Sequence, residues 1–235
     1  SDNCYHVFYH RVGLNITDNT LLNGATISGG YAHDGTSNEF ISPYNNLGGG
    51  MFNYDSYPTL SNVKICNNSA ISGAGIYTGG AQKLTNVLIS NNSATNFGGG
   101  FYNNLTSPTL TNVTITNNSA VSGGGIYCKN ATLSDTSVLK NCIIRDNMAT
   151  SLGDEIFIGS GMTMLLKYSC YGNKSGDVSN SGTFIPDAYC ITSDPDFVDD
   201  ANNDYRLSGN SLCIDKGHND YNSESTDIRG ENRVQ

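Results

Sequence analysis

The chain has 235 residues, a hydrophobic content of 37% and a formal net charge of −9, with 12 basic and 21 acidic residues. The few basic residues form no stripe, so nothing supports nucleic-acid binding, and no apolar run suggests a membrane span. Such a low hydrophobic content suits a narrow repeat structure with a surface of Asn, Ser, Thr and Gly better than a compact core.

The N-terminal part is predicted to form a strand followed by an early coil. CYHVFYHRV (residues 4–12) has the composition of a β-strand, and no signal peptide precedes it. We therefore expect the natural chain to extend further at its N-terminal end. Residues 20–32 predict a coil in which Ile27 takes the place of Ile65 in the next one. Residues 34–47 are an insertion between these coils and the predicted specificity loop of the repeat region.

One sequence motif occurs four times between residues 62 and 149. It reads NVKICNNSA, NVLISNNSA, NVTITNNSA and NCIIRDNMA, with steps of 24, 26 and 29 residues, a spacing typical of solenoids. The V-x-I-x-N alternation has the two-residue period of a strand. The third copy predicts three short strands, at residues 108–110, 113–115 and 125–127. This pattern predicts a single-stranded parallel β-helix, right-handed by the crossover rule.

In a parallel β-helix, equivalent residues of successive coils stack about 4.8 Å apart. The alternation predicts inward aliphatic columns and, at the corner, a column of asparagines that tolerate left-handed angles and satisfy backbone groups. The predicted columns are Val63, Val87 and Val113; Ile65, Ile89 and Ile115; and Asn67, Asn91 and Asn117.

Each copy is followed by a glycine cluster and an aliphatic–aromatic pair. Only one member of each pair can face inward, and we expect this to be the aliphatic one. The outer column would then contain Tyr77, Tyr102 and Tyr127, which are candidate ligand-binding residues because aromatic rings stack on sugars. The alternative is that these rings only cover the sheet.

The periodic pattern stops after residue 183. Residues 184–235 are acidic and rich in turns, and we interpret them as a C-terminal cap of the same domain, covering the last coil of the solenoid at residues 1–183. Asp194, Asp196 and Asp199 are candidate Ca²⁺ ligands, although Asp-Pro also favours turns. No other cofactor is expected. The seven cysteines have no metal-ligand spacing. Disulfides are possible among the C-terminal cysteines, and the odd count leaves at least one cysteine unpaired.

Two stretches resemble a known family. SPTLTNVTITNNSA followed by GGGIY resembles the β-helix repeats of bacterial (Bacteroidetes-type) cell-surface proteins and, more distantly, the repeats of chlamydial polymorphic outer-membrane proteins. The tail, DPDFVDDANNDYRLSGNSLCIDKG and DIRGENR, is similar to the segment that closes such β-helices before an anchoring domain. The resemblance implies export to the cell surface or the extracellular space, and a natural chain that continues at the C-terminal end as well.

The sequence is compatible with two functions. The first is a non-enzymatic, adhesin-like stalk that contacts a polysaccharide or a host glycan. The alternative is a polysaccharide lyase or glycoside hydrolase, whose chemistry needs a base with a charge neutraliser, or two carboxyl groups. The compact candidates for it are Arg145, Asp146, Asp154 and Glu155, which are otherwise solvated corner charges. Ice binding is not supported, because no outward column repeats threonine.

Overall fold

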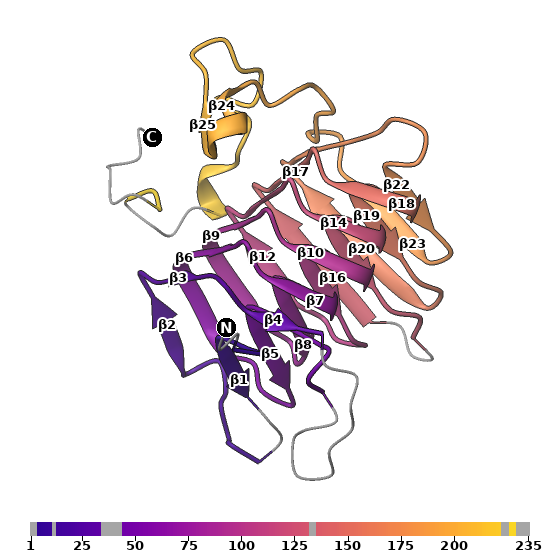
Figure 1. Ribbon diagram of the computed structural model, residues 1–235. Helices are drawn as coiled ribbons and strands as arrows, with labels where there is room; N and C mark the ends of the chain where they lie inside the picture. Colours follow the sequence, from indigo (N-terminus) through magenta and orange to yellow (C-terminus); the bar gives the residue numbers. More distant parts are fainter. Residues whose placement is uncertain (1–3, 11–12, 34–43, 132–134, 222–225, 229–235) are drawn as a thin grey trace.

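The computed structural model describes residues 4–10, 13–33, 44–131, 135–221 and 226–228. It is a parallel β-solenoid, as the sequence predicted (Figure 1). Residues 34–43, most of the predicted insertion loop, lie outside the described residues.

Three parallel sheets run along the solenoid, and each stacks one kind of strand from successive coils. The seven-stranded sheet contains β1 (Phe8–His10), β5 (Met51–Tyr54), β8 (Ile76–Gly79), β11 (Phe101–Asn103), β15 (Ile126–Cys128), β19 (Ile156–Ile158) and β22 (Val178–Asn180). The five-stranded sheet contains β4 (Tyr31–Ala32), β7 (Ser69–Ser72), β10 (Ser93–Phe97), β14 (Ser119–Ser122) and β18 (Met148–Leu152).

The eleven-stranded sheet carries two strand pieces per coil, which join into one strand in β6 and β9. It contains β2 (Leu21–Asn23), β3 (Thr26–Ile27), β6 (Thr59–Cys66), β9 (Lys83–Ser90), β12 (Thr109–Thr111), β13 (Thr114–Thr116), β16 (Asp135–Lys140), β17 (Ile143–Arg145), β20 (Met162–Lys167), β21 (Cys170–Tyr171) and β23 (Thr183–Pro186). The third copy of the repeat therefore has four strands, β12 to β15, where the sequence predicted three. The missed strand is β14, whose small side chains gave no apolar alternation.

Each coil turns at three residues with left-handed φ. In the third copy these are Asn112 (φ 55°), Asn117 (φ 53°) and Gly123 (φ 64°). Asparagine and glycine are the residue types that adopt this conformation most readily, which explains why they recur at the corners. The same corners in other coils are Asn62, Asn86 and Asn141; Asn67, Asn91 and Asp146; and Gly73, Gly98 and Gly153.

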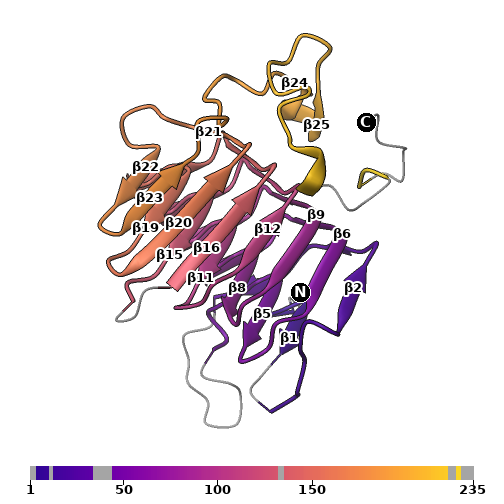
Figure 2. The same ribbon diagram turned by 180° about the vertical axis from the view of Figure 1, so that it is seen from behind.

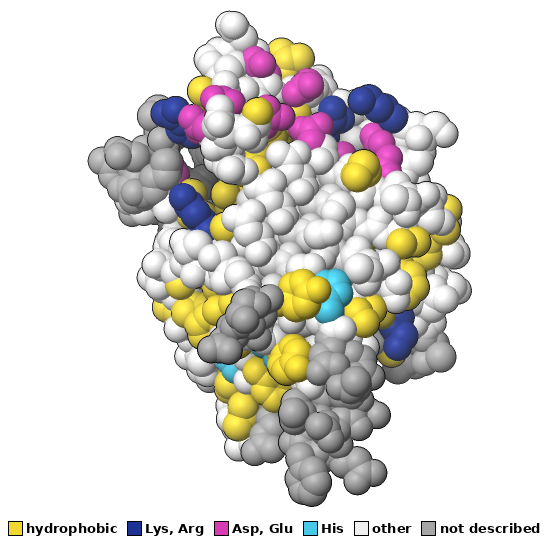
Figure 3. Space-filling model, viewed as in Figure 1, with side chains coloured by type: hydrophobic (Ala, Val, Ile, Leu, Met, Phe, Trp, Pro, Cys, Tyr) yellow, Lys and Arg dark blue, Asp and Glu magenta, His cyan; other side chains and the backbone are white. Residues whose placement is uncertain are grey.

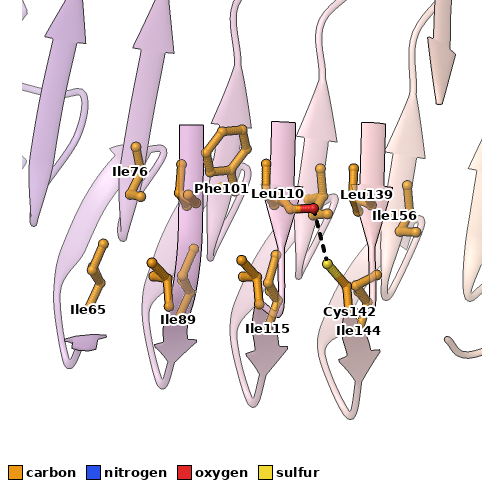
Figure 4. Close-up of a cluster of buried hydrophobic side chains, with 14 of the residues drawn as sticks. Ile65, Ile76, Ile89, Phe101, Leu110, Ile115, Leu139, Cys142, Ile144 and Ile156 are labelled. Carbon is orange, nitrogen blue, oxygen red and sulfur yellow. Dashed lines mark hydrogen bonds between the residues drawn. The ribbon is translucent and has the colours of Figure 1, made fainter. Parts of the chain in front are cut away.

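The predicted inward columns form the core (Figure 4). Every side chain of the valine and isoleucine columns is at most 2% exposed, and Ile27 pairs with Ile65 as expected. The aliphatic members of the later pairs, such as Ile76 and Ile126, also point into this core. Cys142 takes a valine position, and its Sγ lies 3.6 Å from the carbonyl oxygen of Leu110.

The end of the chain folds back along the solenoid. β23 pairs with β20, and Ile191 bridges to Cys170, so these residues continue the last coil. Residues 192–221 and 226–228, here called the C-terminal arm, then run beside earlier coils (Figures 1 and 2). The arm contains the antiparallel pair β24 (Phe197–Asp199) and β25 (Asp204–Leu207), with the 3₁₀ turns η1 (Asp200–Asn202) and η2 (Asn219–Tyr221).

Hydrogen bonds fix the arm to asparagines at the corners of earlier coils. Asn86 Nδ2 donates to the carbonyl oxygen of Thr226 at 3.1 Å, and Asn141 Nδ2 donates to that of His218 at 3.0 Å. The segment that we expected to cover the last coil thus lies mainly along the side of earlier ones. Acidic side chains gather on this arm, whereas the neighbouring face of the solenoid is largely free of charge (Figure 3).

Candidate functional site

The predicted aromatic column exists, but its rings are stacked on one another. The ring centroids of Tyr77 and Tyr102 lie 4.9 Å apart, those of Tyr102 and Tyr127 lie 5.1 Å apart, and Phe52 and Phe157 extend the stack at either end. Tyr77 and Tyr102 are only 6% and 7% exposed, and burial raises the pKa of both phenols. Because the ring faces are occupied, this column does not offer the open stacking platform for sugars that the sequence suggested.

The stack is therefore expected to stabilise the fold. Tyr102→Leu should lower the free energy of unfolding by about 1–2 kcal/mol, since it keeps an apolar side chain but loses two ring contacts. Urea unfolding measures this change. Val121→Leu, at an exposed position of β14, should change the free energy by no more than about 0.5 kcal/mol. Equal stability of the Tyr102 variant and the parent would show that the rings contribute nothing.

A buried ladder of asparagine side chains runs along one corner. Asn92 Oδ1 accepts from N and Nδ2 of Asn68 at 3.1 and 3.0 Å, while N and Nδ2 of Asn92 donate to Asn118 Oδ1 at 3.0 and 2.9 Å. Asn118 donates in the same way to Asn147. All four residues are at most 7% exposed. The hydrogen-bonded column is thus formed by the second asparagine of each pair. It is not formed by the predicted Asn67, Asn91 and Asn117.

Glu155, a predicted catalytic candidate, ends this ladder. Its Oε2 accepts from Nδ2 and N of Asn147 at 2.6 and 3.3 Å, the two donors that an asparagine Oδ1 accepts in earlier coils. The next coil has Gly172 nearby, where a Cβ would lie 2.7 Å from Glu155 Cγ. The glutamate side chain therefore fills the place of a missing asparagine.

The environment of Glu155 favours its neutral form. The side chain is buried, with the residue 4% exposed. Burial is the largest cause that raises the pKa of Glu155, from the usual 4.5 to about 8, against the lowering effect of the hydrogen bonds from Asn147. The negative charge of Asp177 adds to the increase.

Two of the other catalytic candidates, Arg145 and Asp154, bind backbone groups. Arg145 is buried, and its Nη1 donates to the carbonyl oxygens of Tyr171 and Thr192 at 3.5 and 3.3 Å. The Oδ1 atom of Asp154 accepts from the backbone N of Ala149 at 2.8 Å. Asp146 is an exposed residue at a left-handed corner, with φ 61°. A glycosidase needs two carboxyl groups that flank one bond, and Glu155 faces the ladder instead.

The three candidate metal ligands serve local turns. Asp194 Oδ1 accepts from the backbone N of Asp196 at 2.8 Å, and Asp199 accepts from N and Nδ2 of Asn202 at 3.3 and 2.8 Å. Asp196 accepts a hydrogen bond from the Ser208 hydroxyl. Within the described part of the chain, no three His, Cys, Asp or Glu residues lie close enough together to hold a metal ion. Calcium binding stays a prediction from sequence.

A groove lies between the C-terminal arm and the outer face of the eleven-stranded sheet. Its volume is about 770 Å³. The floor is one outward column, Lys64, Leu88 and Thr114, which are paired in register on β6, β9 and β13. Tyr205 and Arg206 form part of the arm's wall. The other lining residues are Asn86, Val87, Asn112, Val198, Asp204, Leu207, Asp227 and Ile228.

Tyr205 ties the wall of the groove to the solenoid. Its hydroxyl accepts from Nδ2 of Asn91 at 3.0 Å and from Nδ2 of Asn117 at 3.2 Å, and donates to Asn203 Oδ1 at 3.2 Å. The half-buried side chains of Asn91 and Asn117 thus hold the arm in place. Arg206 Nε donates to Asp204 Oδ1 at 2.7 Å, which orients the guanidinium beside the groove.

The sequence did not predict this groove, because it depends on the arm folding back. One signal was present. The outward column changes from Lys64 to Leu88 and Thr114, so it places an apolar side chain on a face where Asn, Ser and Thr would suffice. Single outward apolar residues are common on protein surfaces, so this signal alone was too weak to predict the groove.

These features define a parallel β-solenoid with a side groove covered by its own C-terminal arm. No family model matches the chain, no curated protein matches it, and no solved structure matches it. Among the described residues, no helix is long and apolar enough to cross a membrane.

Proposed function

We propose that the chain is a non-enzymatic β-solenoid module of an exported bacterial protein, displayed at the cell surface, which contacts carbohydrate through the groove beneath its C-terminal arm. The observation that carries the proposal is the groove itself. Its volume of about 770 Å³ lies in the range of small-ligand sites, which combine apolar walls with a few polar groups.

The chemistry of the groove suits a sugar. The apolar side chains of Leu88 and Leu207 line the groove together with the ring of Tyr205, and Lys64, Thr114 and Arg206 bring hydrogen-bond donors. Sugar rings have apolar faces and a rim of hydroxyl groups, so they need this mixture. The face of the coils that Figure 3 shows is largely free of charge, which fits contact with a neutral or weakly charged polymer better than with nucleic acid.

The enzymatic alternative gains no support from the residues that suggested it. Arg145, Asp154 and Glu155 each bind a group of the fold, and none of the four candidates lines the groove. The resemblance of the repeats and of the tail to bacterial surface proteins favours a displayed stalk with an adhesin-like role and a polysaccharide or host glycan as its partner.

A matched pair of substitutions tests the groove. Leu88→Arg places a long charged side chain on the floor and is expected to weaken binding to glycan-array hits at least tenfold, equivalent to about 1.4 kcal/mol. Val121→Arg makes the same kind of change at a position on β14 that is 39% exposed and should leave binding unchanged. Equal loss in both variants, or none in the first, would contradict the assignment of the groove.

A further inference from the structure

Two cysteine side chains meet where the arm leaves the last coil. Cys170 belongs to β21, which lies at the end of the solenoid beside the start of the arm (Figure 2). It pairs in register with Ile143, an outward position of the same column as Lys64 and Leu88. Cys170 is nevertheless only 3% exposed, because the arm covers it.

The arm contributes the second thiol. The side chains of Cys170 and Cys213 are hydrogen-bonded to each other. Cys170 Sγ also lies 3.2 Å from the carbonyl oxygen of Ser193, at the beginning of the arm. Thus both the first residues of the arm and a residue twenty positions later in it contact the same thiol.

The position of Cys213 is fixed by its own turn. Ser211 Oγ accepts from the backbone N of Cys213 at 3.1 Å and donates to the carbonyl oxygen of Pro195 at 2.5 Å. Ser211 is buried, whereas Cys213 is half-buried and accessible from outside. One thiol of the pair is therefore reachable by a solution reagent, and its buried partner is held against it.

The two thiols differ in acidity, and the difference favours Cys213 as the attacking thiol. The hydrogen bond from Cys170 lowers the pKa of Cys213, and the positive charge of Arg145 contributes. The thiolate is the species that attacks a disulfide, and a lowered pKa favours it. The pKa of Cys170 is raised, because it donates that hydrogen bond and is buried.

We propose that Cys170 and Cys213 form a reversible disulfide that fastens the C-terminal arm to the last coil of the solenoid. In the forward direction the Cys213 thiolate attacks one sulfur of a small disulfide such as oxidised glutathione, forming a mixed disulfide and expelling one thiolate. Cys170 loses its proton and attacks the Cys213 sulfur, which expels the second thiolate and closes the bond. Two thiols of the chain are oxidised, and the small disulfide is reduced to two thiols.

The first readout is the connectivity. The full chain is treated with oxidised glutathione at pH 8, the remaining thiols are alkylated, and peptides are mapped by mass spectrometry without reduction. The expected product joins the peptides that contain Cys170 and Cys213, and dithiothreitol separates them. The link should persist in Cys66→Ser and be absent from Cys213→Ser. A dominant link to Cys142, Cys190 or Cys4, or alkylation of both Cys170 and Cys213 after oxidation, would overturn the pairing.

The second readout is the rate at which trypsin cleaves the arm. Lys216 lies three residues beyond Cys213 and is exposed, so trypsin nicking after this residue reports how often the arm lifts from the solenoid. Oxidation is expected to slow this cleavage at least tenfold in the parent chain and to leave the rate unchanged in Cys213→Ser. If the cross-link forms but cleavage is equally fast, the disulfide does not fasten the arm, and that part of the proposal fails.

Discussion

Asn118→Ala is expected to lower the free energy of unfolding by roughly 4 kcal/mol, the largest effect of any single substitution considered for this chain. Alanine removes the acceptor for N and Nδ2 of Asn92. It also removes the donor for the carbonyl oxygens of Ile89 and Thr116 and for Asn147 Oδ1. Asn118 is 1% exposed, so water cannot replace these bonds without entering the coil.

The neighbouring residue supplies the control. Asn117 has the left-handed φ that glycine tolerates, and its side chain binds Tyr205 on the arm instead of the ladder. Asn117→Gly should therefore cost about 1 kcal/mol or less. Chemical denaturation of both variants, followed by far-ultraviolet circular dichroism, gives the comparison. A similar loss of stability in the Asn117 and Asn118 variants would show that the ladder contributes no more to stability than the contact with the arm.

Glu155→Gln is expected to stabilise the chain at pH 8 by roughly 3 kcal/mol and to have little effect near pH 4.5. The pKa of this carboxyl rises from 4.5 to about 8 on folding. Between these values the folded state binds more protons than the unfolded state, so stability falls as the pH rises. Glutamine keeps an oxygen that accepts from Asn147, and it carries no charge at any pH.

Urea unfolding at pH 5 and pH 8 separates this effect from a general gain. The parent should lose stability between the two pH values, and Glu155→Gln should lose much less. Asp55→Asn removes a charge at an exposed position with φ 49°, which asparagine also adopts, and should follow the parent. A Glu155→Gln chain with the pH dependence of the parent would mean that Glu155 is not buried against the ladder.

The repeated sequence motif predicted the solenoid, its coil boundaries and its core columns. Alternation in V-x-I determines which side chains point inward, and the spacing between copies determines which residues stack. The same reasoning placed the aliphatic member of each pair inside and the aromatic member outside. It left open whether the rings bind a ligand or bury one another, since the orientation of each ring depends on how the side chains pack.

The error in the asparagine column has a simple geometrical origin. The first asparagine of each pair turns the chain with a left-handed φ, and strand alternation does not carry through such a residue. The second asparagine, such as Asn118, therefore points inward. The third glycine of each cluster gives a signal for this arrangement, because a Cβ on Gly100 would lie 3.1 Å from Asn118 Nδ2. Glu155 takes the place of that glycine in the coil where the ladder ends.

The arm was the part least accessible to sequence reasoning. It has no repeat, and its contacts with Asn86, Asn91, Asn117 and Asn141 join residues that are 77 to 140 positions apart. Its acidity and turn residues predicted an irregular segment, and this much is seen. The direction in which the arm runs depends on tertiary packing alone. The groove and the contact between Cys170 and Cys213 depend on that direction.

The most direct test of the proposed function is to incubate the chain with a panel of acidic and neutral polysaccharides and to measure binding and product formation in the same wells. Retained polymer reports binding, while absorbance of an unsaturated uronate and release of reducing ends report cleavage. We expect binding that Leu88→Arg abolishes, without any product. Product formation that depends on Asp146, Asp154 or Glu155 would contradict this account and favour a polysaccharide lyase or glycoside hydrolase.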